Sequence, residues 1–245
     1  MIDFLQPHPI IGHFGIVQLY AHGLFFALGA ELAALLLSRW MAKVAPEIDS
    51  WRLSLEVFLA GLLGARLSYF LIYPDRYHSA ADFLAIWQGG LVSFGGILAG
   101  LLLLLYRLRS LSRNQRWQVL DLFSLAVLFA WSVGRIGNYY AADSMGIEST
   151  TWSLTYGRVP IQLFESMLAL GLGLSGYWLW KKERFYPGWY TLYALLSYFS
   201  GRLIIDFWRE EEQILGLGNS QWASLLSLGI IGLGVFFYRR QKHFK

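Results

Sequence analysis

Long apolar runs recur along the chain, separated by short polar stretches. Seven of these runs hold about 20 residues each, enough for a helix to cross a hydrocarbon core of roughly 30 Å. We place them near residues 16–38, 53–73, 89–106, 118–140, 160–180, 188–207 and 220–238. No loop between them could form a second folded unit. The pattern predicts an all-α integral membrane protein with seven transmembrane helices and one transmembrane domain over residues 1–245.

Basic residues gather at one set of run ends. They follow the first, third, fifth and seventh runs, as in Arg39, Arg107, Lys181 and Arg239. Because Lys and Arg are enriched in cytoplasmic loops, this asymmetry predicts an external N-terminus and a cytoplasmic C-terminus.

The composition supports a membrane protein. The chain is 56% hydrophobic and 15% charged, whereas soluble domains carry roughly 25% charged residues. It contains no cysteine, which excludes disulfides, thiolate metal sites and a cysteine nucleophile on this chain. The first apolar run follows a segment with two prolines and no basic residue, so we expect it to be retained and not cleaved as a signal peptide.

Three arginines lie inside apolar runs: Arg66, Arg135 and Arg202. Each falls in the second half of a run that leads from the inside to the outside, so all three lie in the outer half of the membrane. Inserting one arginine near a helix centre costs about 2.5–3.5 kcal/mol. Three such costs at one depth require a common explanation.

The spacing of acids gives these arginines different prospects. Arg202 has Asp206 at i+4 and Arg209 at i+7 on the same helix face, so a local ion pair is one interpretation. Arg135 has no acid at i±3 or i±4, and its i+3 neighbour is Asn138. It therefore needs an acid on another helix, an anionic ligand, or a path along which it snorkels to the headgroups.

Small residues surround Arg66. Gly61, Ala65, Gly64 and Ser68 form two small-xxx-small pairs, which predict close helix packing. The third run is rich in glycine in the same half, including Gly95 and Gly96, which indicates tight packing or a broken helix that lines a cavity. Arg66 itself could pair with Glu165 or Asp143, and the sequence does not choose between them.

Polar residues from several runs lie in the outer half of the membrane, at the depth of the three arginines. Among them, a lone histidine such as His22 is more often a structural residue. These polar residues are His22, Arg66, Arg135, Asn138, Asp143, Gln162, Glu165, Arg202 and Asp206. Their alignment predicts an anion site in the outer leaflet, where the commonest anion is a phospholipid phosphate.

Long segments of the chain resemble the prolipoprotein diacylglyceryl transferase family of the bacterial cytoplasmic membrane. The resemblance extends from "LYAHGLFFALGA" through "GARLSYFLIY", "WQGGLVSFGGILAG", "VGRIGNYYAADSMG" and "VPIQLFES" to "GRLIIDFWRE". The family signature is centred on Gly-Arg-x-Gly-Asn, here residues 134–138.

The resemblance implies a seven-span enzyme whose active cavity opens to the outer leaflet of the bacterial cytoplasmic (inner) membrane. Its reaction would move a diacylglyceryl group from phosphatidylglycerol to the lipobox cysteine of a prolipoprotein signal peptide, releasing glycerol phosphate. We expect no cofactor, no metal and no nucleic-acid partner.

The resemblance also assigns residues. The essential arginines of the family fall on Arg135 and Arg202, which we expect to clamp the lipid phosphate. Asp143 or His22 could accept the thiol proton, so these four residues are the catalytic candidates. The substrate-binding candidates are Arg135, Asn138, Gly146, Arg66, Gln162, Glu165, Asp206, Arg209, Phe94, Gly95 and Gly96.

Several positions depart from the family pattern. His22 replaces a usual tyrosine, Phe94 a histidine of some members, Ala141 and Ala142 an Asn-Gly pair, Asp143 and Asp206 glutamates, and Val159 a histidine.

The departures leave open a divergent lipid-binding relative with another acceptor or no activity. A small anion transporter is a further alternative, although the inner halves of the runs are nearly bare of polar groups and only Asp121 could begin a path.

Overall fold

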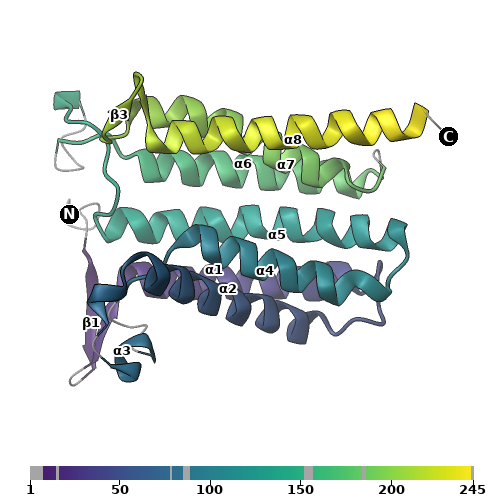
Figure 1. Cartoon of the computed structure of the whole chain (residues 1–245), viewed down its shortest axis with the longest axis horizontal. Coiled ribbons are helices and arrows are strands. Elements are labelled where there is room, and N and C mark those ends of the chain that lie inside the picture. Colours follow the sequence, from purple (N-terminus) through teal and green to yellow (C-terminus); the bar gives the residue numbers. More distant parts are fainter. Residues whose placement is uncertain are drawn as a thin grey trace. The chain divides into compact units, whose positions relative to one another are not determined.

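The computed structural model describes residues 8–14, 17–77, 79–84, 89–151, 157–183 and 186–243, and these ranges are mostly helical (Figure 1). Each of the seven predicted runs contains one long helix. The helices are α1 (Ala21–Met41), α2 (Ser50–Ile72), α3 (Ala80–Leu84), α4 (Ser93–Arg107), α5 (Arg113–Tyr140), α6 (Ile161–Lys181), α7 (Trp189–Ile205) and α8 (Asn219–His243). Short 3-10 turns η2 (Pro74–Arg76), η4 (Leu108–Ser110) and η6 (Asp206–Trp208) follow α2, α4 and α7.

Four helical segments in the described part are long and apolar enough to cross a membrane. They are Ala21–Met41, Ser50–Ile72, Ser93–Ser110 and Arg113–Tyr140. Helices α6, α7 and α8 coincide with the last three predicted runs, and their crossing of the membrane stays a prediction.

The start of the first predicted span was wrong. Strands β1 (Ile10–Phe14) and β2 (Val17–Tyr20) pair antiparallel, and helix α1 begins only at Ala21. This segment is apolar, but Gly12 and the β-branched residues Ile10, Ile11 and Val17 favour strand over helix. A second antiparallel pair, β3 (Gln213–Ile214) and β4 (Leu217–Gly218), precedes α8. The described part is therefore mostly helical, consistent with the predicted all-α membrane protein, and carries two small hairpins.

The chain divides into two compact units. The first comprises Met1–Ala33 with Leu120–Lys245, and the second comprises Ala34–Val119. Helices α6, α7 and α8 lie wholly in the first unit, and α2 and α4 lie wholly in the second.

In the second unit, α2 and α4 pack with their backbones in contact. A Cβ on Gly95 would lie 1.8 Å from Ser68 Oγ, and one on Gly64 would lie 2.5 Å from the Gly95 carbonyl oxygen. Gly96 also lies close to Gly61, since a Cβ on Gly96 would lie 2.9 Å from the Gly61 carbonyl oxygen. These contacts confirm the packing role predicted for the small residues around Arg66.

In the first unit, α5, α6 and α7 share a core. Leu128, Ala169 and Ala194, one from each helix, form its buried centre. The α5 residue Asp121 caps the N-terminus of α7, because its carboxylate accepts from the Gly188 and Thr191 backbone N–H groups at 2.7 Å each. The described contacts thus give Asp121, the one inner-side acid that could begin an ion path, a structural role at the start of α7.

We expect Gly95→Ala to destabilise the protein, because the new Cβ would meet Ser68 Oγ and the Gly64 backbone. Overpacking of this kind costs about 1–3 kcal/mol, measurable as a lower thermal unfolding temperature in detergent. Gly171→Ala in α6 is the matched control, since nothing lies within 4 Å of its added Cβ. Equal unfolding temperatures for the two variants would contradict the close α2–α4 contact.

Candidate functional site

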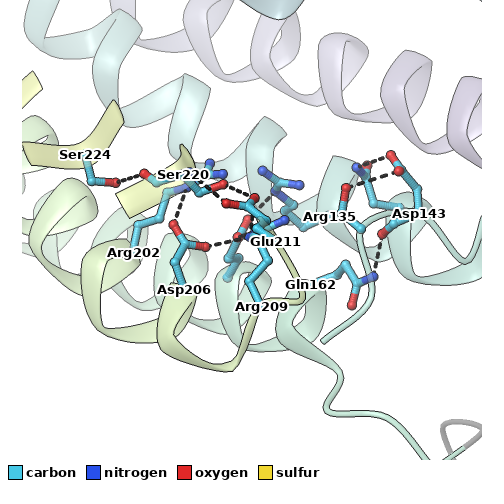
Figure 2. Close-up of polar contacts among 12 residues, drawn as sticks. Arg135, Asp143, Gln162, Arg202, Asp206, Arg209, Glu211, Ser220 and Ser224 are labelled. Carbon is cyan, nitrogen blue, oxygen red and sulfur yellow. Dashed lines mark hydrogen bonds and ion pairs between the residues drawn. The ribbon is translucent and has the colours of Figure 1, made fainter. Parts of the chain in front are cut away.

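Five charged side chains form a continuous, largely buried network in the first unit (Figure 2). Glu165 is fully buried and contacts two arginines: its Oε2 lies 2.5 Å from Arg135 Nε, and its Oε1 accepts from Arg209 Nη2. Arg209 Nε donates to Asp206 Oδ1 at 2.8 Å, and Arg202 Nε donates to Asp206 Oδ2 at 3.2 Å. The order is thus cation, anion, cation, anion, cation.

Helices α5, α6 and α7 and the turn η6 bring these side chains together, with Arg202 in the last turn of α7. Arg135 lies near the end of α5, and Glu165 lies one turn into α6, which begins just after Pro160. Asp206 begins η6, so that Arg209 follows it by three residues and turns back onto the same carboxylate. The pair predicted between Arg202 and Asp206 is confirmed, and Arg135 finds its acid on another helix, one of the alternatives its sequence left open.

Arg209 is the saturated member of the network. Its side chain is 5% exposed, contacts Glu165 and Asp206, and lies 3.5 Å from Glu211 Oε1. Three carboxylates around one guanidinium leave it little capacity for a ligand. Arg209 therefore holds the acids in place, and the substrate contact expected from the sequence stays a prediction.

The two terminal arginines keep unused donors. Among the residues that the structure describes, no acceptor bonds Arg135 Nη1 or Nη2, nor Arg202 Nη2. A guanidinium presents its donors in a fixed fork that matches two phosphate oxygens. Each end of the network can therefore still bind an anion.

An aromatic pair that sequence reasoning missed connects these ends. The Arg135 guanidinium lies 4.6 Å from the Trp131 ring centroid, and Trp131 Nε1 donates to the Tyr198 hydroxyl. Arg202 Nη1 lies 3.5 Å from the same hydroxyl. Each aromatic residue precedes its arginine by four positions, so the i,i+4 spacing was the signal available in the sequence.

A second polar cluster lies where α5 ends. Asp143 is exposed, and its carboxylate accepts from Asn138 Nδ2 at 3.4 Å and from Ser144 Oγ at 3.1 Å. Ala142 and Ser144, on either side of it, have φ values of 54° and 57°. Positive φ values are uncommon for residues other than glycine, so Ala142 and Ser144 mark a constrained turn around Asp143.

Gln162 holds this corner from α6. Its side chain is buried, and Nε2 donates to the Asp143 carbonyl oxygen at 2.5 Å. These contacts fix the orientation of the amide. In the flipped orientation the amide oxygen would face the Asp143 carbonyl oxygen and Met145 Sδ, neither of which can donate a hydrogen bond. The remaining atom, Oε1, is buried, and no donor in the described part of the chain bonds it. An unpaired buried acceptor is costly and is suited to a hydroxyl donor from a ligand.

Gly146 and Arg158 fasten the segment after α5 to the end of α7. A Cβ on Gly146 would lie 2.5 Å from the Val159 carbonyl oxygen and 2.7 Å from that of Trp208, so only glycine fits. Arg158 Nη1 donates to the Gly146 carbonyl at 3.2 Å and to Glu210. Pairing with Glu210 raises the pKa of Arg158 above its ordinary value.

Arg66 binds backbone carbonyls in the second unit. Nε donates to Phe83 at 2.9 Å, Nη2 to Asp82 at 2.5 Å, and Nη1 to both Gly89 and Gly90. Gly89 and Gly90 have φ values of 82° and 75°, which turn their carbonyls toward the guanidinium. Neither Glu165 nor Asp143, the acids weighed from the sequence, is among these partners.

The other candidates take different positions. Phe94 is 73% exposed at the start of α4, and Gly95 and Gly96 contact α2. His22 is exposed in the first turn of α1. In the described part of the chain, no group of three or more His, Cys, Asp or Glu side chains is arranged to hold a metal ion.

Comparison with known proteins identifies similar chains. The family model described as prolipoprotein diacylglyceryl transferase matches residues 9–240. A phosphatidylglycerol–prolipoprotein diacylglyceryl transferase of Chloroherpeton thalassium is 28% identical over 253 aligned residues, covering 96% of this chain and 93% of the relative. The protein of the same name from Streptococcus pneumoniae strain Hungary19A-6 is 31% identical over 219 residues, covering 82% of this chain and 81% of the relative.

We expect Glu165→Gln to destabilise the protein strongly, because the change leaves two buried arginines around a neutral amide. Breaking a buried ion pair by removing one partner costs about 3–5 kcal/mol. Glu56→Gln is the matched control: Glu56 also contacts two arginines, Arg52 and Arg107, but in a more exposed position. Thermal unfolding in detergent should show the larger loss for Glu165→Gln. Equal losses would mean that the buried network contributes no more to stability than the more exposed ion pairs of Glu56.

Proposed function

The chain belongs to the prolipoprotein diacylglyceryl transferase family, and we propose on that premise that it transfers a diacylglyceryl group from phosphatidylglycerol to a prolipoprotein. The acceptor is the thiol of the lipobox cysteine in the signal peptide. The observation that carries this proposal is the pair Arg135 and Arg202. Both keep free guanidinium donors at the ends of one buried network, and Trp131 and Tyr198 connect them.

The proposed setting is the bacterial cytoplasmic membrane. Seven helices of one transmembrane domain cross it, with the N-terminus outside and the C-terminus in the cytoplasm. The match of α6, α7 and α8 to the last three apolar runs supports this arrangement, as does the basic character of alternate run ends. Arg135 and Arg202 then lie in the outer half of the membrane, close to the phosphates of the outer leaflet.

The reaction follows from charge at the phosphodiester. The thiolate attacks the carbon of the diacylglyceryl group that carries the phosphate. A C–S bond forms, and the bond between that carbon and the phosphate oxygen breaks, so that the oxygen leaves with the phosphorus. Glycerol phosphate leaves with one more negative charge on its phosphate. Arg135 and Arg202 stabilise that developing charge with donors that are already oriented, so the transition state gains more than the bound lipid.

The thiol must lose its proton before it can attack. Glu165 and Asp206 are each held by two arginines, whereas within the described residues Asp143 contacts the neutral side chains of Asn138 and Ser144. We assign proton acceptance to Asp143, with His22 as the alternative. We assign binding of the glycerol headgroup hydroxyls to Asn138 and to Gln162 Oε1, which no described donor bonds.

The proposal is tested with purified protein, phosphatidylglycerol labelled in its acyl chains and a lipobox peptide that contains cysteine. We expect label on the peptide, and none with a Cys→Ser peptide or with Arg135→Ala. Tight lipid binding through Arg135 without transfer would instead identify a divergent relative that kept its lipid site. Anion uptake into proteoliposomes without transfer would favour a transporter.

We expect Arg135→Lys to leave transfer impaired, because an ammonium group cannot offer two parallel donors to a phosphate. Loss of one oriented donor to a developing anion lowers the rate by about 10²–10³-fold. Arg76→Lys is the control, since Arg76 is exposed in η2 and contacts the Tyr73 ring. Near-normal transfer by Arg135→Lys would refute the two-donor clamp.

A further inference from the structure

The hairpin of β3 and β4 carries apolar side chains at its tip. It connects η6 to α8 and turns at Leu215 and Gly216, with Ile214 paired to Leu217. Ile214 is 56% exposed and Leu215 is 89% exposed. A polar residue would cost nothing in water at this tip, so the apolar choice needs an explanation.

The backbone conformation at the tip also disfavours leucine. Leu215 and Gly216 have φ values of 54° and 81°, the pattern of a type I′ turn, in which Asn, Asp or Gly is the usual first residue. A branched apolar residue with positive φ is a rare conformation that persists only where the surroundings enforce it. Here the chain keeps both the unfavourable backbone and the exposed side chain.

The hairpin continues an apolar stripe of α8. Leu226, Ile230 and Leu233 are 65%, 71% and 59% exposed and follow one another at helical spacing on one face. Trp222 lies one turn before Leu226 on that face, and its Nε1 donates to the Ile214 carbonyl oxygen at 2.9 Å. The hairpin is thus hydrogen-bonded to the first turn of α8. It projects away from the N-terminal end of that helix (Figure 1).

We propose that the β3–β4 hairpin inserts Ile214 and Leu215 into the outer leaflet at the boundary between headgroups and acyl chains. This inference rests on the proposed function, in which α8 crosses the membrane with its N-terminal end outside. The exposed α8 stripe then faces acyl chains, and a hairpin fixed to its outer end meets the same lipid. Trp222 sits at the level where tryptophan is enriched in membrane proteins.

Insertion of the hairpin would fix the depth of the arginine network. Glu211, two residues before β3, accepts from the Ser220 backbone N–H at 2.8 Å and lies 3.5 Å from Arg209 Nε. The hairpin is therefore tied at its base to both α8 and Arg209. An anchor at the headgroup boundary holds the network level with the lipid phosphates.

The absence of cysteine in the chain allows a direct test. Leu215→Cys and, as a second position, Ile214→Cys are labelled with an environment-sensitive fluorophore and reconstituted into phosphatidylglycerol vesicles. Glu212→Cys is the matched control, because Glu212 is exposed and polar and immediately precedes the same hairpin. Quenching is measured with lipids that carry a nitroxide high on the acyl chain and with iodide in the aqueous phase.

We expect the nitroxide lipid to quench the labels at 214 and 215 several-fold more than the label at 212, and iodide to show the reverse order. Strong iodide quenching at 215 would place the tip in water and overturn the proposal. Protection from both quenchers would also overturn it, because a protein surface would then cover the tip. The measurement does not depend on transfer, so a failure of the proposed activity is distinguished by the separate labelled-lipid assay.

Discussion

The contact of Glu165 with two arginines is the constraint on which the site depends. A fully buried carboxylate must be paired, and this one is held by Arg135 from α5 and Arg209 from the segment after α7. The pairing ties three parts of the chain, far apart in sequence, to one point. If one of these helices moved alone, Glu165 and an arginine would be left buried without a partner, at a large cost in free energy. The end of α5, the start of α6 and the end of α7 are therefore coupled.

The same network separates arginines that hold the structure from arginines that can act. Arg209 is enclosed by three carboxylates, whereas within the described residues Arg135 and Arg202 each have one carboxylate partner and keep donors that no acceptor bonds. Their guanidinium groups are oriented by those single partners and by Trp131 and Tyr198. An anion that binds there meets donors that need no rearrangement, which is the condition for electrostatic stabilisation of a transition state.

The sequence predicts those parts of the fold that depend on one helix at a time. Hydropathy placed the long helices, small-residue spacing indicated the α2–α4 contact, and the i,i+4 rule paired Arg202 with Asp206. It left open whether Glu165 would meet Arg135, since that contact joins two helices and has no spacing of its own. The carbonyl partners of Arg66 were also out of reach, because backbone carbonyls leave no mark in a sequence. The N-terminal hairpin was missed because hydropathy does not distinguish an apolar strand from an apolar helix.

The departures from the family pattern divide according to this geometry. Asp206 is the only one inside the arginine network, and its shorter side chain still reaches Arg202 and Arg209 at 3.2 and 2.8 Å. The substitutions at Ala142 and Asp143 lie at the corner after α5, where Ala142 adopts a left-handed conformation that glycine would adopt without strain. The arginines of the proposed phosphate site are therefore unchanged from the family pattern, while the groups proposed to take up a proton have changed. Any difference in chemistry between this chain and its relatives should lie in how the thiol is deprotonated, not in how the lipid is held.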